Sequence, residues 1–285
     1  MALRVFVDGA AGTVGSALHL HLAYMVAEGV IEQLVLPEAH RKDAEWRKAV
    51  MREADIVVLC LPDDEAGAAV ALVESVNPGA RILDASATHR CHPEWVYGLP
   101  ELGFAEAIGQ SARVANPGCF ASACILGGKP LVEAFALPLM AFQGVTGYSA
   151  AGKKGTPEGA PMLVQFGKAH RHLPEIARYT GAQAVLTTMV GPWKRGMLVQ
   201  AYVPVDADRV YDVLAQAYAG TQVSVAMADA THGRVDPQGC NGSNAVAISV
   251  AGQPGGGASV AVVLDNLGKG SAGAAADNLK RMISS

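Results

Sequence analysis

One cysteine of the chain stands in a setting that favours nucleophilic chemistry. Cys119 follows the run Asn116-Pro117-Gly118 and precedes residues that can begin a helix. A helix amino terminus lowers the pKa of a thiol and makes it a better nucleophile, and its backbone N–H groups can stabilise an oxyanion. The Pro-Gly turn argues against simple core packing here. The other four cysteines are interpreted as inert packing residues: Cys60, Cys91, Cys124 and Cys240.

A candidate acid–base group lies in residues 170–176, which read HRHLPEI. In an extended segment, His170 and His172 would share one face. Their spacing suits proton transfer beside a nucleophile, and it would equally suit a metal. No third cluster of ligands is apparent in the sequence, so we expect no metal site. The residues alone leave open which histidine handles the proton.

A glycine-rich loop near the amino terminus has the form of a dinucleotide-binding turn. A β-rich run at residues 3–8 leads into this loop, and a helical pattern follows through about residue 28. Glycines let the backbone turn sharply and approach a pyrophosphate, whose charge is attracted by the N–H groups of the helix start. Because the turn opens a βαβ pattern, its residues are expected to bind a cofactor: Gly9, Gly12, Thr13, Val14 and Gly15.

The segment after the second expected strand bears on the choice between NAD and NADP. An acidic residue at the end of that strand would bind the ribose 2′-hydroxyl, whereas cations accept a 2′-phosphate. The sequence offers Glu38 followed by His40, Arg41 and Lys42. The cationic cluster favours NADP(H), with Arg41 and Lys42 as contacts, while Glu38 keeps NAD open.

The elements that must position these residues follow two patterns. Expected strands at residues 33–36, 56–61 and 81–84 alternate with helices, which predicts an α/β fold with an amino-terminal Rossmann-type, doubly wound parallel sheet. Beyond Cys119 a helix precedes longer β-rich runs, typical of an α+β domain with a mostly antiparallel sheet. That helix and those runs are expected at residues 123–138, 184–190, 197–204, 245–250 and 258–264, and a final helix is expected within 270–283.

Composition limits the classes of partner. The 285 residues are 51% hydrophobic with a net charge of −4, which predicts two domains with sizeable cores and no attraction to nucleic acid or an anionic membrane. No apolar run approaches the roughly 18 residues of a membrane span, and the amino terminus does not read as a signal peptide. The five cysteines are odd in number and irregularly spaced, so they form neither a disulfide framework nor CxxC pairs. We therefore expect a cytoplasmic enzyme that acts on a small molecule.

Several motifs, in order along nearly the whole chain, carry a family resemblance. They are DGAAGTVG (8–15), LDASATHR (83–90), WVYGLPEL (95–102), ANPGCFAS (115–122), GYSAAGKK (147–154), HRHLPEI (170–176), GSNA (242–245) and DNLGKGSAGAA (265–275). With them the chain resembles the short-form N-acetyl-γ-glutamyl-phosphate reductases of arginine biosynthesis, which belong with the aspartate-semialdehyde dehydrogenases. It departs from their pattern at Phe120, where Tyr is common, and at Thr88-His89-Arg90, where Asp-Phe-Arg is more usual.

The resemblance implies an activity and a set of roles. The activity is NADPH-dependent reductive dephosphorylation of an acyl phosphate, N-acetyl-γ-glutamyl phosphate, to the semialdehyde through a thioester on Cys119. His170 is implied as the acid–base partner and Asn266 as the contact of the nicotinamide carboxamide. The implied substrate-binding residues are Arg90, Ser149, Lys153, Lys154 and His172.

The resemblance also implies a domain plan and an assembly. Residues 1–118 and 265–285 would form the NADP-binding domain, and residues 119–264 the catalytic and oligomerisation domain of a homodimer or homotetramer. Two alternatives stay open: a reductase of a related acyl phosphate (aspartyl or carrier-bound aminoadipyl phosphate), and a non-catalytic NADP-sensing protein. The second would keep the glycine loop but have no use for Cys119 beside a histidine.

Overall fold

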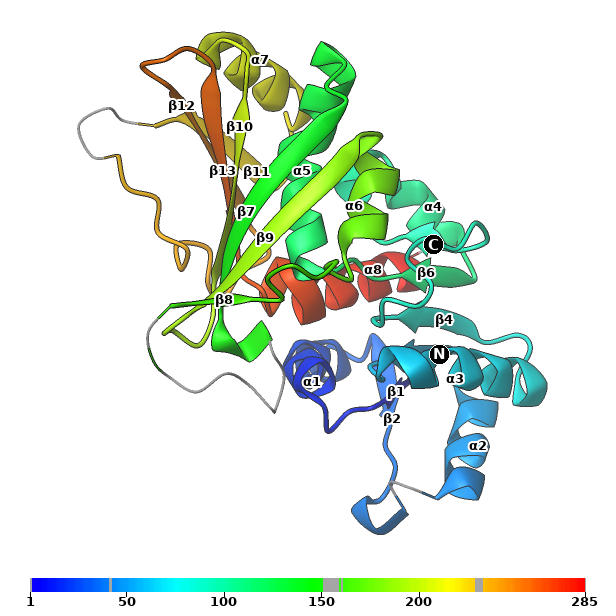
Figure 1. The fold of residues 1–285 in the computed structure, drawn as a ribbon. Helices are drawn as coiled ribbons and strands as arrows, with labels where there is room; N and C mark the ends of the chain where they lie inside the picture. The colour runs from blue at the N-terminus through cyan, green and yellow to red at the C-terminus, as the bar shows by residue number, and fades with distance from the viewer. Residues whose placement is uncertain (1, 41–42, 151–158, 160, 229–232, 285) are drawn as a thin grey trace. The chain divides into compact units, whose positions relative to one another are not determined.

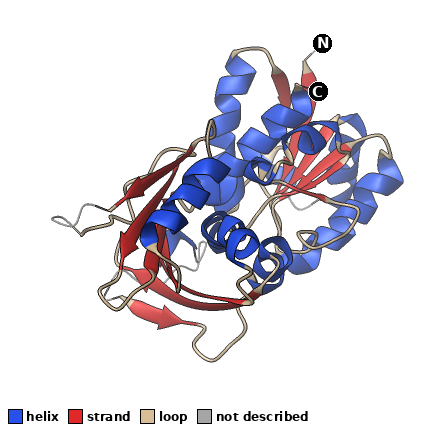
Figure 2. Cartoon of the chain, turned by 90° about the horizontal axis from the view of Figure 1, so that it is seen from above, coloured by secondary structure: helices blue, strands red, loops and turns tan. Residues whose placement is uncertain are grey.

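A computed structural model describes residues 2–40, 43–150, 159, 161–228 and 233–284 of the chain (Figures 1 and 2). The chain divides into two compact units. The first unit comprises Met1–Pro117 and Ser271–Ser285, and the second comprises Gly118–Gly270. Among the described residues, none of the helices combines the length and the apolar character needed to cross a bilayer.

The first unit is built on a parallel sheet of six strands in the order β2-β1-β3-β4-β6-β5. The strands are β1 (Leu3–Asp8), β2 (Ile31–Leu34), β3 (Ile56–Leu59), β4 (Arg81–Asp84), β5 (Val96–Tyr97) and β6 (Arg113–Ala115). The helices are α1 (Thr13–Ala27), α2 (Ala44–Glu53), α3 (Asp63–Val76), α4 (Ala105–Gln110) and α8 (Gly273–Ile283), with short turns η1 (Glu38–His40) and η2 (Pro100–Leu102).

Helices cover both faces of this sheet because successive strand residues point to opposite sides. Val5 and Val7 of β1 pack in one cluster with apolar residues of α1, α4 and α8. Phe6, between them, packs in a second cluster with residues of α2 and α3. All four residues of β3 are buried, as expected for a parallel strand between two helix layers. The predicted doubly wound sheet is confirmed.

The second expected strand lies two residues earlier than its apolar pattern suggested. Pairing of β2 with β1 ends at Leu34, opposite Phe6. Val35 and Leu36 line a pocket instead of continuing the ladder. The expectation of a strand at residues 33–36 is therefore wrong in its boundaries, because an apolar run alone does not distinguish a paired strand from a pocket wall.

The second unit contains a mixed sheet in the order β11-β12-β13-β10-β7-β9-β8. Four of its described strand pairings are antiparallel and two are parallel, which agrees with the mostly antiparallel prediction. The strands are β7 (Leu139–Gly147), β8 (Met162–Val164), β9 (Gln183–Gly191), β10 (Met197–Val203), β11 (Val223–Met227), β12 (Val246–Gly252) and β13 (Ala258–Leu264).

One face of the mixed sheet is covered by helices within the same unit. These are α5 (Cys119–Phe135), α6 (Leu173–Thr180) and α7 (Ala207–Ala217), and Figure 1 shows α5 and α6 on the same side of the strands. Along β7, Met140 and Phe142 are buried whereas Leu139, Ala141 and Gln143 are exposed. The exposed set belongs to the face that these helices leave open.

Candidate active site and cofactor pocket

Cys119 is the first residue of α5, a helix of 17 residues. Gly118 is the N-cap in an extended conformation, and no side chain caps the helix start. The partial positive charge of a helix start favours an anion such as a thiolate. Cys119 is half-buried, whereas Cys124, one turn and a half further along α5, is fully buried. The helix thus begins at Cys119 rather than at the expected residue 123.

A buried carboxylate holds the backbone directly before the cysteine. Glu175 of α6 is 2% exposed and accepts a hydrogen bond from the Gly118 N–H at 3.2 Å. His172 is 3% exposed, and its Nε2 lies 4.0 Å from Oε1 of Glu175. Burial and the charges of Glu175 and Cys119 raise the pKa of the Cys124 thiol. Sequence reasoning assigned no role to Glu175, although it stands in the HRHLPEI motif.

The two histidines meet through a turn and not through an extended segment. His172 has helical backbone angles and is the N-cap of α6. The expectation that the pair share one face of an extended chain is therefore wrong, because α6 begins immediately after them. The turn nevertheless brings the two rings to 4.6 Å between centroids.

His170 differs from His172 in access and in hydrogen bonding. It is half-buried and lines two pockets of the second unit, of about 630 and 220 Å³. Its Nδ1 accepts from the His172 N–H at 3.1 Å, so a neutral ring carries its proton on Nε2. Burial, and secondarily the charge of Arg171, lower the pKa of His170 to about 4. At neutral pH, His170 is therefore uncharged.

Glycines allow the close packing around this site. The Phe120 ring lies against the backbone of Gly144 in β7, where an added Cβ would come within 2.3 Å of it. The same ring meets His170 edge-on at 5.6 Å. An added Cβ on Gly270 would lie 2.7 Å from Cβ of Cys119. Gly144 of β7 and Gly270, after β13, thus lie against the first two residues of α5.

Two further predicted residues contact one another. Asn266 is 2% exposed, and its Nδ2 donates to Oγ of Ser149 at 2.9 Å. Its Oδ1 accepts from the Gly196 N–H at 2.8 Å. The neighbouring Arg195, which sequence reasoning missed, is partly exposed and pairs with the buried Asp265 at 2.6 Å. The sequence feature that could have pointed to Arg195 is its position as a cation in the short connection between β9 and β10.

The LDASATHR motif forms a buried polar cluster in the first unit. Arg90 is 6% exposed, and its guanidinium donates to the carbonyls of Asn116 at 2.8 Å and Ala85 at 3.2 Å. His89, at the unusual position, pairs through Nδ1 with the buried Asp84 at 2.6 Å and stacks on Trp95. Arg90 therefore supports the segment that leads to Cys119. Its predicted phosphate contact stays a prediction.

The glycine loop has the backbone that its spacing predicted. Gly9 adopts φ +87°, and a Cβ there would lie 2.4 Å from the carbonyl oxygen of Cys60. A Cβ on Gly15 would lie 2.4 Å from the Gly9 oxygen. Gly12 is the N-cap of α1, whose first two residues are Thr13 and Val14. Only glycine fits these close approaches, which allow α1 to begin at Thr13 after a short turn from the end of β1 at Asp8.

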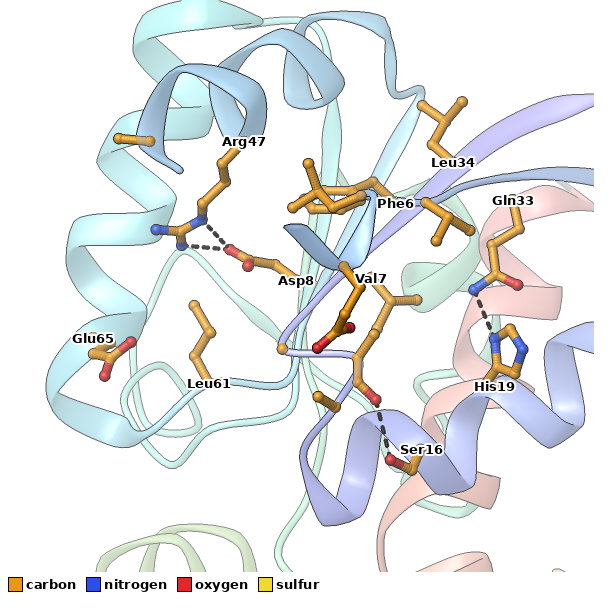
Figure 3. Close-up of a pocket in the computed structure, with 17 residues that line it drawn as sticks. Phe6, Val7, Asp8, Ser16, His19, Gln33, Leu34, Arg47, Leu61 and Glu65 are labelled. Atoms are coloured by element: carbon orange, nitrogen blue, oxygen red, sulfur yellow. Dashed lines mark hydrogen bonds and ion pairs between the residues drawn. The ribbon is translucent and has the colours of Figure 1, made fainter. Parts of the chain in front are cut away.

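A pocket of about 800 Å³ adjoins the glycine loop (Figure 3). Its lining combines the loop backbone, apolar side chains and a few polar groups, as nucleotide pockets do. Leu34, Leu36 and Leu61 provide apolar surface, and Arg47 of α2 provides a cation. The residues present therefore fit a dinucleotide. The predicted contacts Arg41, Lys42, Lys153 and Lys154 lie outside the described residues.

Comparisons with known proteins agree with this architecture. Residues 4–111 match the family model "Semialdehyde dehydrogenase, NAD binding domain" and residues 119–266 match "Semialdehyde dehydrogenase, dimerisation domain". Aspartate semialdehyde dehydrogenase II from Vibrio cholerae has the same fold, with a TM-score of 0.77 at 16% identity over 100% of this chain and 99% of that one. The Candida albicans enzyme, solved with NADP, has a TM-score of 0.67 at 14% identity over 99% of each chain. Fold and family models thus define an oxidoreductase of the semialdehyde dehydrogenase class with a nicotinamide cofactor.

Curated relatives identify a family within the semialdehyde dehydrogenase class. N-acetyl-gamma-glutamyl-phosphate reductase 2 of Pseudomonas putida is 37% identical, covering 98% of this chain and 96% of its own. The N-acetyl-gamma-glutamyl-phosphate reductases of Burkholderia orbicola and Brucella anthropi are 35% and 34% identical, covering 98% and 99% of this chain and 96% and 99% of their own. The chain therefore belongs to the N-acetyl-γ-glutamyl-phosphate reductase family within the semialdehyde dehydrogenases.

Proposed function

We propose that the chain reduces N-acetyl-γ-glutamyl phosphate to N-acetyl-glutamate semialdehyde with NADPH, as a step of arginine biosynthesis. The observation that carries the chemistry is Cys119, half-buried at the first position of a long helix whose N-cap N–H is held by Glu175. The names of relatives that are 34–37% identical support the substrate. The glycine loop and its pocket support the nucleotide.

The proposed covalent chemistry takes place at the start of α5. The Cys119 thiolate attacks the acyl carbon, and phosphate leaves with the electrons of the broken C–O bond, which forms a thioester. Arg90 and Lys153 or Lys154 are proposed to bind the substrate's anionic groups, with Ser149 and His172 beside them. NADPH, when bound, supplies the hydride that reduces the thioester carbonyl.

His170 is proposed as the acid–base group because it is half-buried and lines two pockets, whereas His172 is buried. Its neutral ring carries the Nε2 proton, so it can donate a hydrogen bond to the oxygen that becomes negative during reduction. Collapse of the hemithioacetal anion then breaks its C–S bond, releases the aldehyde and returns the Cys119 thiolate. Asn266 is proposed to hold the carboxamide of the nicotinamide.

The domain plan and assembly are part of the proposal. Residues 1–118 and 265–285 are proposed to bind NADP(H), and residues 119–264 to carry catalysis and self-association. The match to a dimerisation domain supports association of two copies. The open face of the mixed sheet is the proposed contact, since it presents Leu139, Val185 and Tyr202 at 48–56% exposure.

The experiment is a reverse-direction spectrophotometric assay with N-acetyl-glutamate semialdehyde, phosphate and NADP⁺. Phosphate-dependent NADPH formation that stops when Cys119 is alkylated is the expected result. A parallel reaction with NAD⁺ tests the cofactor. Turnover only with aspartate semialdehyde would keep the mechanism and change the substrate. Absence of turnover with either aldehyde would contradict the proposal and favour an NADP-sensing protein.

A further inference from the structure

The cofactor pocket contains an arginine whose position is set by a buried carboxylate. Asp8, the last residue of β1, is 6% exposed. Arg47 extends from the first turns of α2 toward it, and Nε donates to Oδ2 of Asp8 at 2.8 Å while Nη2 donates to the same oxygen. Figure 3 shows both side chains at the pocket, across from Gln33 and His19.

The local fold explains why Arg47 reaches this position. Asp43 caps α2 by accepting from the N–H groups of Glu45 and Trp46, which fixes where the helix begins. Arg47 then lies one turn into the helix. Its guanidinium side chain is 28% exposed, so it is packed into the pocket wall but still open to a ligand.

The hydrogen bonds of this pair leave binding capacity on the guanidinium. A guanidinium has five N–H donors in a rigid plane, and the bonds to Asp8 use two of them. The other three suit the oxygens of a phosphate, which arginine binds in a forked geometry. Because Asp8 already holds the plane in place, little side-chain entropy would be lost when an anion binds.

Neither the last residue of β2 nor the two residues that follow it carry a carboxylate. A carboxylate at the end of this strand hydrogen-bonds the ribose 2′-hydroxyl in NAD-binding folds and repels a 2′-phosphate. Here β2 ends at Leu34, and Val35 and Leu36 follow along the pocket wall. The pocket's carboxylates come from other elements: Asp8 from β1, Glu38 from η1 and Glu65 from α3.

We propose that Arg47, held by Asp8, is a specificity-determining residue of this pocket and recognises the 2′-phosphate of NADP(H). The inference rests on the proposed function for the identity of the cofactor. It adds to that function a residue of α2 that lies outside the cationic cluster at residues 40–42, five positions after Lys42.

Binding of two nucleotides that differ only in the 2′-phosphate tests the proposal without catalysis. Isothermal titration with adenosine 2′,5′-bisphosphate and with 5′-AMP should show tighter binding of the bisphosphate by the native chain. Arg47→Met should weaken the bisphosphate by roughly 10- to 100-fold, the range of a charge-assisted hydrogen-bond pair. Its affinity for 5′-AMP should change less than about twofold, because 5′-AMP lacks the contacted phosphate.

Lys48→Met is the matched control. Lys48 is the next residue of α2, does not line the pocket, and pairs with Glu45 at 2.7 Å. The Lys48→Met variant removes one positive charge from the same helix, and the affinities for both nucleotides should stay unchanged. Because Arg47→Met strands the buried Asp8 carboxylate, the double variant Asp8→Asn/Arg47→Met repeats the test without that charge.

The outcomes separate this inference from the proposed function. Equal weakening of both nucleotides by the Arg47 variants would overturn the specificity role and indicate a structural one. A loss of bisphosphate binding in Lys48→Met equal to that in Arg47→Met would also overturn it, since it would reflect general charge. Reverse-direction turnover by the native chain, measured in parallel, reports on the proposed function and is independent of either result.

Discussion

The five thiols of the chain have different environments, and these environments predict different reactivities. Burial raises the pKa of Cys60 to about 12. Burial likewise raises the pKa values of Cys124 and Cys240. Cys119 is half-buried at the start of α5. The thiolate is the reactive form, so a raised pKa slows alkylation of Cys60, Cys124 and Cys240.

We therefore expect iodoacetamide at pH 7.5 to modify Cys119 at least tenfold faster than Cys60, Cys124 or Cys240. Peptide mass spectrometry over time, with turnover measured on the same samples, checks this. Cys119→Ser should lower turnover on the order of a thousandfold or more, because a hydroxyl is a far weaker nucleophile. Cys91→Ala is the control and should stay active. Loss of activity that follows labelling of another cysteine would contradict the assignment.

The depressed pKa of His170 predicts how stability depends on pH. Its pKa is about 4 in the folded chain against the ordinary 6.5, so between these values the unfolded chain binds more protons. The resulting stabilisation is fully present above pH 6.5 and is lost as the pH falls toward 4. Urea unfolding midpoints should therefore decline over this window, and less steeply in His170→Gln. Parallel profiles for the two chains would show that His170 is not the group responsible.

At the scale of elements, close approaches between backbone segments hold the candidate residues. The Gly118 N–H, at the start of α5, bonds to Glu175 of α6, and Phe120 packs on Gly144 of β7. Gly270 brings the segment after β13 against Cys119. Each contact joins elements distant in sequence, so the geometry of the cysteine depends on the whole second unit.

Gly270→Ala tests this dependence. The new methyl group would lie 2.7 Å from Cβ of Cys119, so the cysteine or its neighbour must shift. A misplacement of about 1 Å at a reacting group can cost on the order of a hundredfold in rate, and we expect kcat to fall at least tenfold. Gly67→Ala, in α3 with open space around it, is the control and should keep full activity. Unchanged kcat in Gly270→Ala would show that the contact is unimportant for the reaction.

At the scale of the whole molecule, self-association is the property to be tested. The mixed sheet of the second unit leaves one face open, with Leu139, Val185 and Tyr202 exposed. Val185→Lys should convert a dimer to a monomer in light scattering after gel filtration, because a charge in an apolar contact is costly to bury. Leu20→Lys, at a 76% exposed site on α1, should leave the mass unchanged. A native chain that is monomeric at micromolar concentration would contradict the proposed dimer.

The sequence could predict the features that depend on neighbouring residues. The spacing of Gly9, Gly12 and Gly15 encodes a turn whose steric demands are local. The apolar runs at β3, β4 and β13 lie within one or two residues of their expected positions. The Gly-rich residues 254–257 lie in the connection between β12 and β13, which pair as antiparallel neighbours. β7 was missed, because its alternating pattern is weakened by alanine, glycine and threonine.

Other features were decided only by the tertiary structure. Arg47 meets Asp8 across 39 residues, Glu175 meets Gly118 across 57, and Asn266 meets Ser149 across 117. The environment of His170, and with it the lowered pKa, also depends on packing. By itself the sequence determined the fold class, the glycine turn and the candidate nucleophile, because local patterns encode these. The partners of each side chain depend on which distant segments are brought together, and only the folded chain specifies that.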